Sequence, residues 1–475
     1  MFELIARQER GAPAIVEAAT GQVTTYGALR AAVEAVAGAL RERGGRQLYF
    51  LRCANTAAAI ATYLGCLRAD RPVCLLEGSR WAEAQRIVEA YRRPALLLPP
   101  EAPPPEGYRA AGTLPTGYYV AVSAAPAEQD IPLHPELSLL LTTSGSTGDP
   151  KLVRLKLSSV QANAEAIAQY LELGPGERSI QSLPVYYSYG LSLVNSHLVA
   201  GGTIVLTPHS FFRPEFWKHF AEQRCTSFAG VPHMYETLKR LRFDPASQPT
   251  LRAMTQAGGK LPEPFIEWYA KAARAAGCRF YVMYGQTEAT ARISYVPPER
   301  LPEKIGSIGI AIPRGKMSLA PVEDAGELRE LVYEGPNVMM GYADSPAALA
   351  LGDELGGVLR TGDLARADAE GYFYIVGRLK RFAKLFGKRV NLMDVELALE
   401  RRYPLRAAAV DSGQDQLILC LECRGEVIEE EVAMETAGQL GVPPACIRVR
   451  RVAALPMTPS GKKDYAAIAR AEHAL

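Results

Sequence analysis

The chain has 475 residues, a formal net charge of +2, 48% hydrophobic residues and 22% charged residues. This length allows two or more domains with their own cores, and the composition is that of a globular protein rather than a disordered or fibrous one. The near-neutral charge, without a long basic or acidic tail, argues against nucleic acid as a partner.

Neither the N-terminus nor any internal stretch has the pattern of a membrane segment. Residues 1–11 mix charged with apolar side chains and lack the apolar core of a signal peptide. The most apolar long stretch, residues 53–67, is too short and too rich in Ala, Thr and Asn to cross a bilayer. We therefore expect no membrane span and a cytoplasmic location.

Eight cysteines in a chain of this size do not indicate a disulfide scaffold. Cys420 and Cys423 form a CxxC within an apolar, strand-like run. Residues three apart on a strand point to opposite faces, so we expect no metal or redox site there.

The first part of the chain alternates between helical and strand patterns. Apolar residues at helical spacing predict a helix after Thr25, which is a suitable N-cap. Residues 47–52, 57–67 and 72–76 then have the patterns of a strand, a helix and a strand, as in a doubly wound α/β layer. Between residues 99 and 135, Pro, Ala and Gly accumulate, which predicts a linker-like covering segment.

A loop dense in hydroxyl groups and glycines follows the apolar run 137–141, which itself predicts a buried strand. The glycines let backbone N–H groups approach an anion, the Ser and Thr hydroxyls add donors, and Lys151 adds a positive charge, which suits polyphosphate. The spacing differs from the GxxxxGK[ST] of P-loop NTPases. For the loop alone, a solvated turn is the alternative. The predicted phosphate-binding residues are Thr143, Ser144, Gly145, Ser146, Thr147, Gly148 and Lys151.

Three tyrosines lie near a Pro-initiated turn after a predicted helix at residues 156–171. Tyr186, Tyr187 and Tyr189 form an amphipathic aromatic wall, which suits one side of a small-molecule pocket. Tyrosines stacked in a core are the alternative. Further along, the pattern predicts a strand, a helix and a strand entering a turn at residues 203–206, 214–223 and 228–232.

The apolar run 280–283 places the sequence YGQTE (284–288) at the C-terminal end of a strand, where α/β sheets present ligand sites. Tyr284 can stack on a purine, and Gly285 permits the turn. Thr287 can donate to a phosphate, and Glu288 can bind Mg²⁺, which neutralises phosphate charge.

Asp363 follows Thr and Gly and precedes a hairpin-like turn at residues 368–371 and a strand at 372–376. Its carboxylate can accept both hydroxyls of a ribose, and Arg378 is the second expected ribose or phosphate contact. A turn-capping role is the alternative for Asp363.

The last part of the chain begins with residues 381–390, which mix Lys and Arg with few strongly apolar residues and predict an exposed hinge and a mobile loop. Lys462 lies on a glycine-containing loop near the chain end, where a lysine is usually solvated. The pattern between them predicts a helix, two strands and a helix at residues 391–402, 407–410, 416–423 and 426–440.

Five stretches occur in one order: TTSGSTGDPK (142–151), YGQTE (284–288), TGD (361–363), GRLK (377–380) and PSGK (459–462). Together they resemble the adenylate-forming, or AMP-binding, superfamily of acyl-CoA synthetases, nonribosomal-peptide adenylation domains and luciferases. The resemblance runs from about residue 24 to the C-terminus. It implies an α/β fold with a large N-terminal domain of doubly wound sheets plus a β-rich subdomain, residues 1–379. A small mobile α+β domain, residues 380–475, follows a hinge at Lys380.

The resemblance also implies roles for single residues. Lys462 matches the catalytic lysine that bridges the acid's carboxylate and the α-phosphate. Gly258 and Gly259 match a stretch between the adenine and acyl sites, and the tyrosine segment enters the acyl pocket. Many members carry His at the position of Tyr187.

Two further departures from the family pattern concern the substrate and the catalytic loop. The tyrosine segment lacks the Asp with which amino-acid-adenylating relatives hold an α-ammonium group. Because a buried ammonium without a carboxylate is costly, we expect an acid other than an α-amino acid. Lys463-Asp464-Tyr465 replaces the usual apolar, acidic and basic continuation.

The predicted function is that of an AMP-forming acid–thiol ligase. It uses ATP and Mg²⁺ to convert a small-molecule carboxylic acid to acyl-AMP and pyrophosphate, and transfers the acyl group to the pantetheine thiol of CoA. A discrete ligase that loads the phosphopantetheine of a carrier protein is one alternative. Another is a catalytically silent acyl-adenylate-binding protein, which predicts loss of residues that are present here: Lys151, Thr287, Glu288, Asp363 and Lys462.

Overall fold

The computed structural model describes residues 1–78, 81–92, 94–125, 132–143, 151–322, 328–379, 381–385, 388–403, 405–413, 415–423, 428–457 and 463–473. The chain divides into two compact units. The larger unit comprises Met1–Thr143, Pro150–Lys316 and Tyr333–Leu359, and the smaller unit comprises Ser144–Asp149, Met317–Val332 and Arg360–Leu475.

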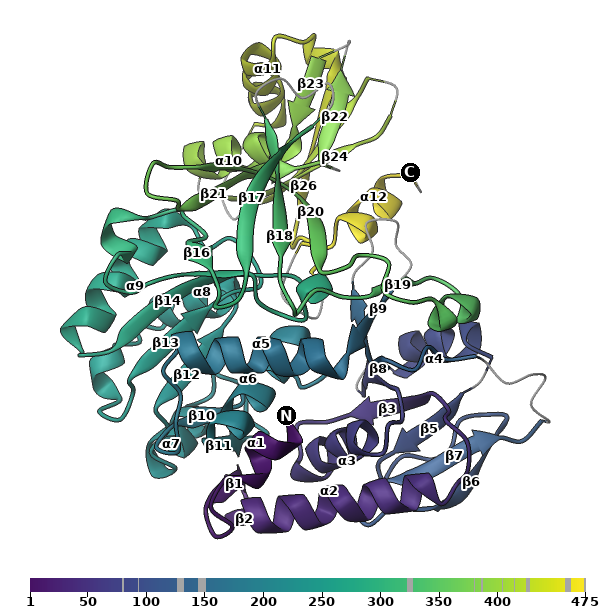
Figure 1. The fold of residues 1–475 in the computed structure, drawn as a ribbon. Helices are drawn as coiled ribbons and strands as arrows, with labels where there is room; N and C mark the ends of the chain where they lie inside the picture. Colours follow the sequence, from purple (N-terminus) through teal and green to yellow (C-terminus); the bar gives the residue numbers. More distant parts are fainter. Residues whose placement is uncertain are drawn as a thin grey trace. The chain divides into compact units, whose positions relative to one another are not determined.

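Two large sheets form the framework of the larger unit (Figure 1). The nine-stranded sheet has the order β16-β15-β14-β13-β12-β10-β11-β1-β2 and is parallel from β14 to β1. Its strands are β1 (Pro13–Glu17), β2 (Gln22–Thr25), β10 (Arg178–Ile180), β11 (Thr203–Leu206), β12 (Ser227–Gly230), β13 (Ala253–Gln256), β14 (Arg279–Tyr284), β15 (Ser294–Val296) and β16 (Ile310–Ala311).

The eight-stranded sheet has the order β19-β9-β8-β4-β3-β5-β7-β6, with a parallel centre from β8 to β5 and antiparallel edges. Its strands are β3 (Tyr49–Cys53), β4 (Val73–Glu77), β5 (Ala95–Leu98), β6 (Tyr108–Thr113), β7 (Tyr119–Ser123), β8 (Leu137–Thr143), β9 (Lys151–Lys156) and β19 (Gly341–Ala343).

Helices follow the strands along the chain, as expected for parallel crossovers. The first long helix begins as predicted, because the Thr25 side chain accepts a hydrogen bond from the N–H of Ala28 at 3.2 Å. The helices are α1 (Phe2–Ala6), α2 (Tyr26–Arg41), α3 (Ala57–Arg68), α4 (Trp81–Ala90), α5 (Leu157–Tyr170), α6 (Ser188–Ala200), α7 (Pro214–Glu222), α8 (Pro232–Arg240) and α9 (Glu263–Ala275).

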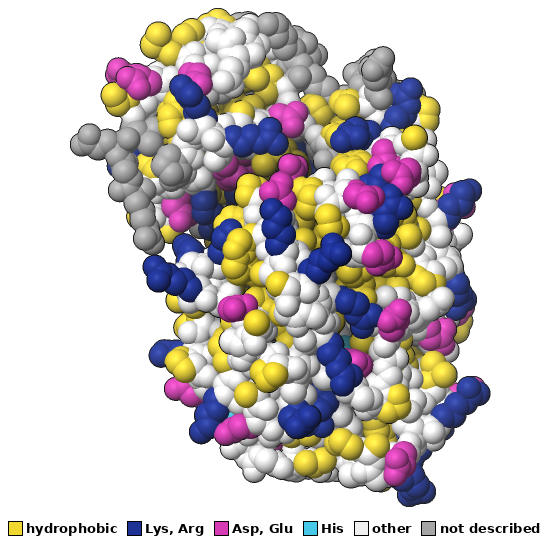
Figure 2. All heavy atoms as spheres, turned by 90° about the vertical axis from the view of Figure 1, so that its left-hand side faces the viewer, with side chains coloured by type: hydrophobic (Ala, Val, Ile, Leu, Met, Phe, Trp, Pro, Cys, Tyr) yellow, Lys and Arg dark blue, Asp and Glu magenta, His cyan; other side chains and the backbone are white. Residues whose placement is uncertain are grey.

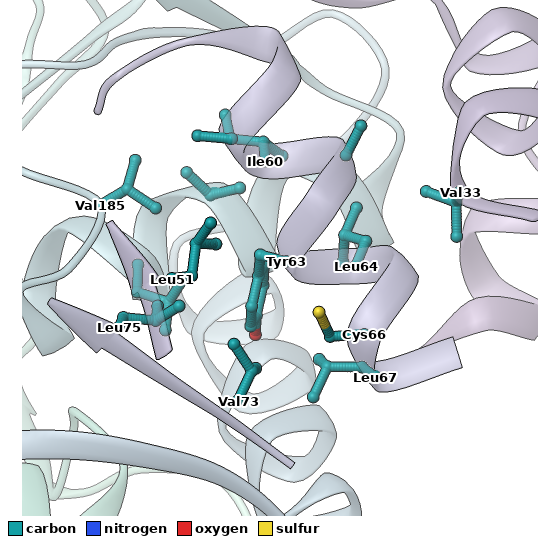
Figure 3. Close-up of a cluster of buried hydrophobic side chains, with 14 of the residues drawn as sticks. Val33, Leu51, Ile60, Tyr63, Leu64, Cys66, Leu67, Val73, Leu75 and Val185 are labelled. Atoms are coloured by element: carbon teal, nitrogen blue, oxygen red, sulfur yellow. The ribbon is translucent and has the colours of Figure 1, made fainter. Parts of the chain in front are cut away.

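Alternation along β3 shows how the eight-stranded sheet is buried on both faces. Tyr49 and Leu51 belong to one apolar cluster and Phe50 to another. The first cluster also contains Tyr63 of α3 and Ile204 of the nine-stranded sheet, so one core joins both sheets. Figure 3 shows Tyr63 pointing into this core among Leu51, Leu75 and Val73. Burial on both faces explains why these strands are continuous apolar runs.

The smaller unit is built on a four-stranded sheet of order β17-β18-β20-β21, a two-stranded hairpin and a three-stranded sheet of order β24-β25-β26. One apolar cluster packs α10 and α11 on the three-stranded sheet, and a second includes Ile468 of α12. The elements are β17 (Lys316–Pro321), β18 (Arg329–Glu334), β20 (Val358–Ala367), β21 (Phe373–Arg378), β22 (Phe382–Leu385), β23 (Lys388–Asn391), α10 (Leu392–Arg402), β24 (Leu405–Asp411), β25 (Leu417–Cys423), α11 (Glu429–Leu440), β26 (Ile447–Val452) and α12 (Tyr465–His473).

The predicted α/β class is confirmed, and so is the opposite orientation of Cys420 and Cys423. Cys420 lies in the cluster with Ile468, whereas Cys423 packs against the other cluster of the smaller unit. The domain boundary predicted between residues 379 and 380 falls within the second compact unit. As the division between two moving parts, it stays a prediction.

Two sequence interpretations are wrong. The segment expected to be a linker contains β6 and β7, which extend the eight-stranded sheet. The segment expected to be a mobile loop after residue 380 contains the hairpin β22–β23, in which Ala383, Leu385 and Val390 are buried. A two-stranded ribbon needs apolar residues at only a few alternate positions to bury one face, and the many basic residues between them hid that pattern.

In the described part of the chain, no helix is long and apolar enough to cross a membrane. On the face shown in Figure 2, Lys and Arg side chains are interspersed with Asp, Glu and apolar side chains rather than gathered in one basic field. This distribution agrees with the small net charge.

Asn337, which is 1% exposed, ties two distant segments of the larger unit together. Its side-chain amide donates to the carbonyl oxygens of Ala289 at 2.8 Å and Arg292 at 2.9 Å, and its side-chain oxygen accepts from Tyr333 Oη at 2.7 Å. Its backbone carbonyl accepts from Thr290 Oγ1 at 2.7 Å. Asn337 therefore fixes the chain that follows the YGQTE motif.

We predict that Asn337→Ala lowers the free energy of unfolding by about 3 kcal/mol, because it removes three buried hydrogen bonds, two to backbone carbonyls and one from the phenol of Tyr333. Urea denaturation measures this loss. Tyr333→Phe is the control, since it removes one of the three side-chain hydrogen bonds and should cost about 1 kcal/mol. Equal losses in the two variants would contradict the role assigned to Asn337.

Candidate functional site

The ends of the predicted phosphate loop are positioned by a pair of strands. Thr143 ends β8, Lys151 begins β9, and the two residues are register partners. The side chain of Thr143 donates to the carbonyl of Lys151 at 3.5 Å. The predicted strand before the loop is confirmed, whereas β9 was not predicted. The remaining predicted phosphate-binding residues, Ser144, Gly145, Ser146, Thr147 and Gly148, lie outside the described residues.

The YGQTE motif forms a tight turn at the end of β14. A Cβ on Gly285 would lie 1.9 Å from the carbonyl oxygen of Ala291, so only glycine fits there. Thr287 and Glu288 form a short 3-10 turn, and Thr290 after it has a φ of +64°. A β-branched residue rarely adopts this conformation, and such strain is typical of functional sites. The hydrogen bonds of Asn337 hold the strained turn in place.

A carboxylate, a phenol and an ammonium group lie close together beside this turn. Glu288 Oε1 accepts a hydrogen bond from Tyr342 Oη at 2.6 Å, and Lys151 Nζ lies 5.3 Å from the centroid of the Tyr342 ring. The N–H of Met339 donates to the carbonyl of Glu288 at 2.9 Å. Tyr342 of β19 therefore contacts both Glu288 and Lys151.

The donor set around Glu288 fits magnesium better than a metal held by the protein alone. Among the described residues, no three His, Cys, Asp or Glu side chains are grouped to hold a metal ion. Mg²⁺ is usually bound by one or two carboxylates together with substrate phosphates and water. A single carboxylate beside a predicted phosphate loop is compatible with that mode.

Tyr187, Gly258 and Thr287 meet on a partly exposed surface. Gly258 has a φ of +87°, and a Cβ on it would lie 2.7 Å from Tyr187 Oη, so the phenol approaches the backbone closely there. Thr287 Oγ1 donates to Ser188 Oγ at 3.2 Å. Burial raises the pKa of Tyr187, so its phenol is neutral near pH 7 and can donate a hydrogen bond.

The other predicted pocket residues, Tyr186, Tyr189 and Gly259, contact neighbouring parts of the larger unit. Tyr189 is 2% exposed and hydrogen-bonds to the side chain of Thr255 at 2.8 Å. Tyr186 packs against the central core cluster, and the carbonyl of Gly259 accepts from Gln256 Nε2 at 2.9 Å. The aromatic wall thus has an accessible part, Tyr187, and an inner part, Tyr189.

In the smaller unit, Asp363 and Arg378 are register partners across β20 and β21 and form an ion pair. The side chain of Asp363 is 3% exposed, whereas that of Arg378 is 53% exposed. The N–H of Asp363 donates to Thr361 Oγ1 at 3.1 Å, within strand β20. The two predicted ribose contacts are therefore adjacent side chains.

A second network of the smaller unit surrounds Glu396, which is 4% exposed. Its carboxylate pairs with Arg381 and with Lys463, the latter at 3.1 Å, and accepts from Tyr465 Oη at 2.9 Å. Lys463 also pairs with Glu400 at 2.9 Å. Lys463 and Tyr465, where the sequence departs from the family pattern, thus bind one buried carboxylate.

This network borders two predicted residues that lie outside the described part, the hinge Lys380 and the catalytic Lys462. Arg381 follows the first and Lys463 follows the second. Lys463 also forms a β-bridge with Met457. The described residues on either side of the segment that contains Lys462 are therefore paired with each other.

Sequence reasoning missed Asn337, Tyr342, Arg292 and Glu396. Tyr342 and Asn337 follow Glu288 by about fifty residues, and no local pattern connects them with it. Two of the four had a signal in the sequence. Arg292 is the single charged residue in the otherwise uncharged stretch 289–298. Glu396 occupies an inward-facing helical position, which for a carboxylate indicates a buried partner.

Comparison with known proteins places this site in a family. A family model described as "AMP-binding enzyme" matches residues 2–343. The chain is 31% identical over 403 residues to a sulfoacetate–CoA ligase of Cupriavidus necator, covering 80% of this chain and 75% of the relative. It is also 31% identical over 407 residues to a feruloyl-CoA synthase of an Amycolatopsis species, covering 82% and 80%.

Among solved structures, o-succinylbenzoate CoA synthetase from Bacillus subtilis, in complex with its acyl-adenylate intermediate, has the same fold, with a TM-score of 0.76 and 21% identity over 98% of this chain and 97% of that one. The predicted recognition and the predicted class of enzyme, an AMP-forming acid–CoA ligase, are confirmed. The chain belongs to the family of AMP-binding enzymes.

Proposed function

We propose that this enzyme activates a carboxylic acid other than an α-amino acid with Mg-ATP and transfers the acyl group to CoA. The observation that carries the proposal is the grouping of Lys151, Tyr342 and Glu288 beside the turn that contains Thr287. A cation and a metal-binding carboxylate at the end of a parallel strand suit a polyphosphate. The CoA ligase and CoA synthase relatives support CoA as the acceptor.

In the first half-reaction, an oxygen of the acid attacks the α-phosphorus of ATP. The new bond joins this oxygen to phosphorus, the bond to the bridging oxygen breaks, and pyrophosphate leaves with the electron pair. Two anions must approach each other, so positive charge is needed where the negative charge develops. Lys151 supplies it at the phosphates and Lys462 at the reacting oxygens, while Thr287 donates to a phosphate. Mg²⁺ bound by Glu288 would neutralise phosphate charge.

In the second half-reaction, the thiol loses its proton and its sulfur attacks the acyl carbonyl carbon. The bond between this carbon and the phosphate oxygen breaks, and AMP leaves with the electron pair. Asp363 and Arg378 hold the ribose of the nucleotide, Tyr284 stacks on the adenine, and Gly258 and Gly259 separate the adenine from the acyl pocket. The predicted C-terminal domain, residues 380–475, rotates at Lys380 between the half-reactions, because Lys462 would otherwise occupy the path of the pantetheine arm. Because the reaction consumes ATP and CoA, which the cytoplasm supplies, a cytoplasmic location fits this function.

The first prediction tests Lys462. Lys462→Ala should lower acid-dependent pyrophosphate exchange about 100-fold or more, because a preorganised charge contributes several kcal/mol to the transition state. Circular dichroism checks that the variant is folded. Near-normal exchange by a folded variant would contradict the catalytic role proposed for Lys462.

The second prediction concerns Lys463 as a positioning residue for Lys462. Lys463→Met should lower kcat of adenylation about 10- to 100-fold and leave KM for ATP nearly unchanged, since it frees one end of the segment that carries Lys462 without touching nucleotide. Lys463→Arg, which keeps the pairing with Glu396 and Glu400, should restore most of kcat. A rise of KM without a fall of kcat would count against this role.

The third prediction concerns the acid. Because no Asp lies between Val185 and Tyr189, pyrophosphate exchange with the common α-amino acids should stay at background, whereas some aryl or aliphatic acid supports turnover. A panel of both kinds of acid tests this. Robust exchange with an α-amino acid and none with plain acids would overturn it. Parallel assays with CoA and with a phosphopantetheinylated carrier protein separate the two possible acceptors.

A further inference from the structure

Arg292 is a buried arginine behind the aromatic wall of the larger unit, and it is 2% exposed. Its backbone carbonyl accepts hydrogen bonds from the amides of Asn163 at 3.2 Å and Asn337 at 2.9 Å, which fix its place in the chain. Its guanidinium carbon lies 4.1 Å from the centroid of the Tyr189 ring. Burial raises the pKa of Tyr170, and the nearby charge of Arg292 acts in the opposite direction.

The positive charge of Arg292 has no carboxylate beside it in the part of the chain that the structure describes. Its Nε is buried without a hydrogen-bond partner. Its Nη1 lies 3.4 Å from the carbonyl oxygen of Ala291, a long and weak contact. The guanidinium is therefore held by aromatic and neutral polar groups and has a donor to spare.

Arg154 shows how the same unit holds a buried guanidinium when the role is structural. It is 0% exposed, pairs with the carboxylate of Glu354, and donates to the carbonyls of Tyr342 at 3.1 Å and Gly352 at 3.2 Å. The protein supplies acceptors for its donors and a carboxylate for its charge. For Arg292, by contrast, Nε has no acceptor and no carboxylate is described beside the guanidinium.

A buried, unpaired cation is costly, and the face of one aromatic ring offsets only a small part of the desolvation cost. Such a charge persists when a ligand supplies the counter-ion. The ring that covers Arg292 belongs to Tyr189, whose centroid is 6.4 Å from that of Tyr187. Arg292 is thus one ring away from the accessible part of the predicted acyl pocket, on its inner side.

We propose that Arg292 binds a second anionic group of the substrate acid, so that the acid is a dianion. One carboxylate reacts with ATP, and a carboxylate or sulfonate at the other end pairs with the guanidinium. This inference rests on the proposed function and names the substrate class of the same pocket. It also agrees with the expectation that the acid is not an α-amino acid, because the charge of Arg292 would repel an α-ammonium group in this pocket.

The test compares acids that share a skeleton and differ in the second charge: glutarate with its monomethyl ester, isophthalate with 3-methylbenzoate, and 3-sulfobenzoate as the sulfonate member. The measured quantity is kcat/KM for acid-dependent pyrophosphate exchange. The wild type should prefer the dianion about 100-fold or more in at least one pair, because a pocket built for a charged partner rejects the analogue that lacks it. The sulfonate and dicarboxylate arms separate the two anionic groups.

Arg292→Met should lose about 100-fold on the preferred dianion and keep its rate on the singly charged partner, and Arg292→Lys should retain an intermediate preference. Arg279→Met is the matched control. Arg279 also lies over a tyrosine ring, that of Tyr281 at 5.7 Å, but it pairs with Glu172 at the surface, so its replacement should leave the preference unchanged.

Two outcomes would overturn the proposal. The first is a wild-type enzyme that prefers the singly charged acid in every pair. This outcome needs no variant, so it counts even if Arg292→Met does not fold. Equal losses on both members of the preferred pair in Arg292→Met would assign Arg292 a structural role. Failure of every acid, dianionic or not, would overturn the proposed function itself, and this inference with it.

Discussion

The close approach of backbone to backbone after β14 is the constraint on which the site of the larger unit depends. Gly285 lies against the carbonyl of Ala291, and Thr290 has a positive φ, so this turn stores strain that other parts of the fold must hold. Asn337 holds it with hydrogen bonds from both its side chain and its backbone. As a consequence, Thr287 and Glu288 are presented at a fixed position at the end of a parallel strand.

The hydrogen bonds of Asn337 also place chemically different groups around the turn. On one side, Glu288 lies beside Tyr342 and Lys151, which suits phosphate and Mg²⁺. On the other, the carbonyl bound by Asn337 belongs to Arg292, whose guanidinium lies over Tyr189. A single buried amide therefore links the proposed phosphate side of the site to the proposed acid side.

Charge is handled differently in the smaller unit. There the carboxylates of Glu396 and Asp363 are almost fully buried, and each is paired with arginine. Lys463 joins the pair at Glu396, which ties the residue after the predicted catalytic lysine to the residue after the predicted hinge. Lys463 and Tyr465, which depart from the family pattern, both bind this carboxylate.

The residue pattern alone indicates the family, the α/β class and the strand that leads into the predicted phosphate loop. It does so because glycines, hydroxyls and charged residues at fixed spacing carry that chemistry locally, and because buried strands are continuous apolar runs. The strand β6 and the hairpin β22–β23 were not predicted, because they carry few large apolar residues. The strand β7 was not predicted because it is short and follows a stretch rich in Pro and Gly.

The side chains that support the motifs become visible in the folded chain alone. Tyr342 meets Glu288, Asn337 meets Ala289 and Lys463 meets Glu396 across 54, 48 and 67 positions of sequence. Such contacts depend on how strands and helices pack, which no local pattern contains. Likewise, the sequence shows a lone Arg292, but that its charge is buried over an aromatic ring, without a described carboxylate beside it, follows from burial, which only the folded chain defines.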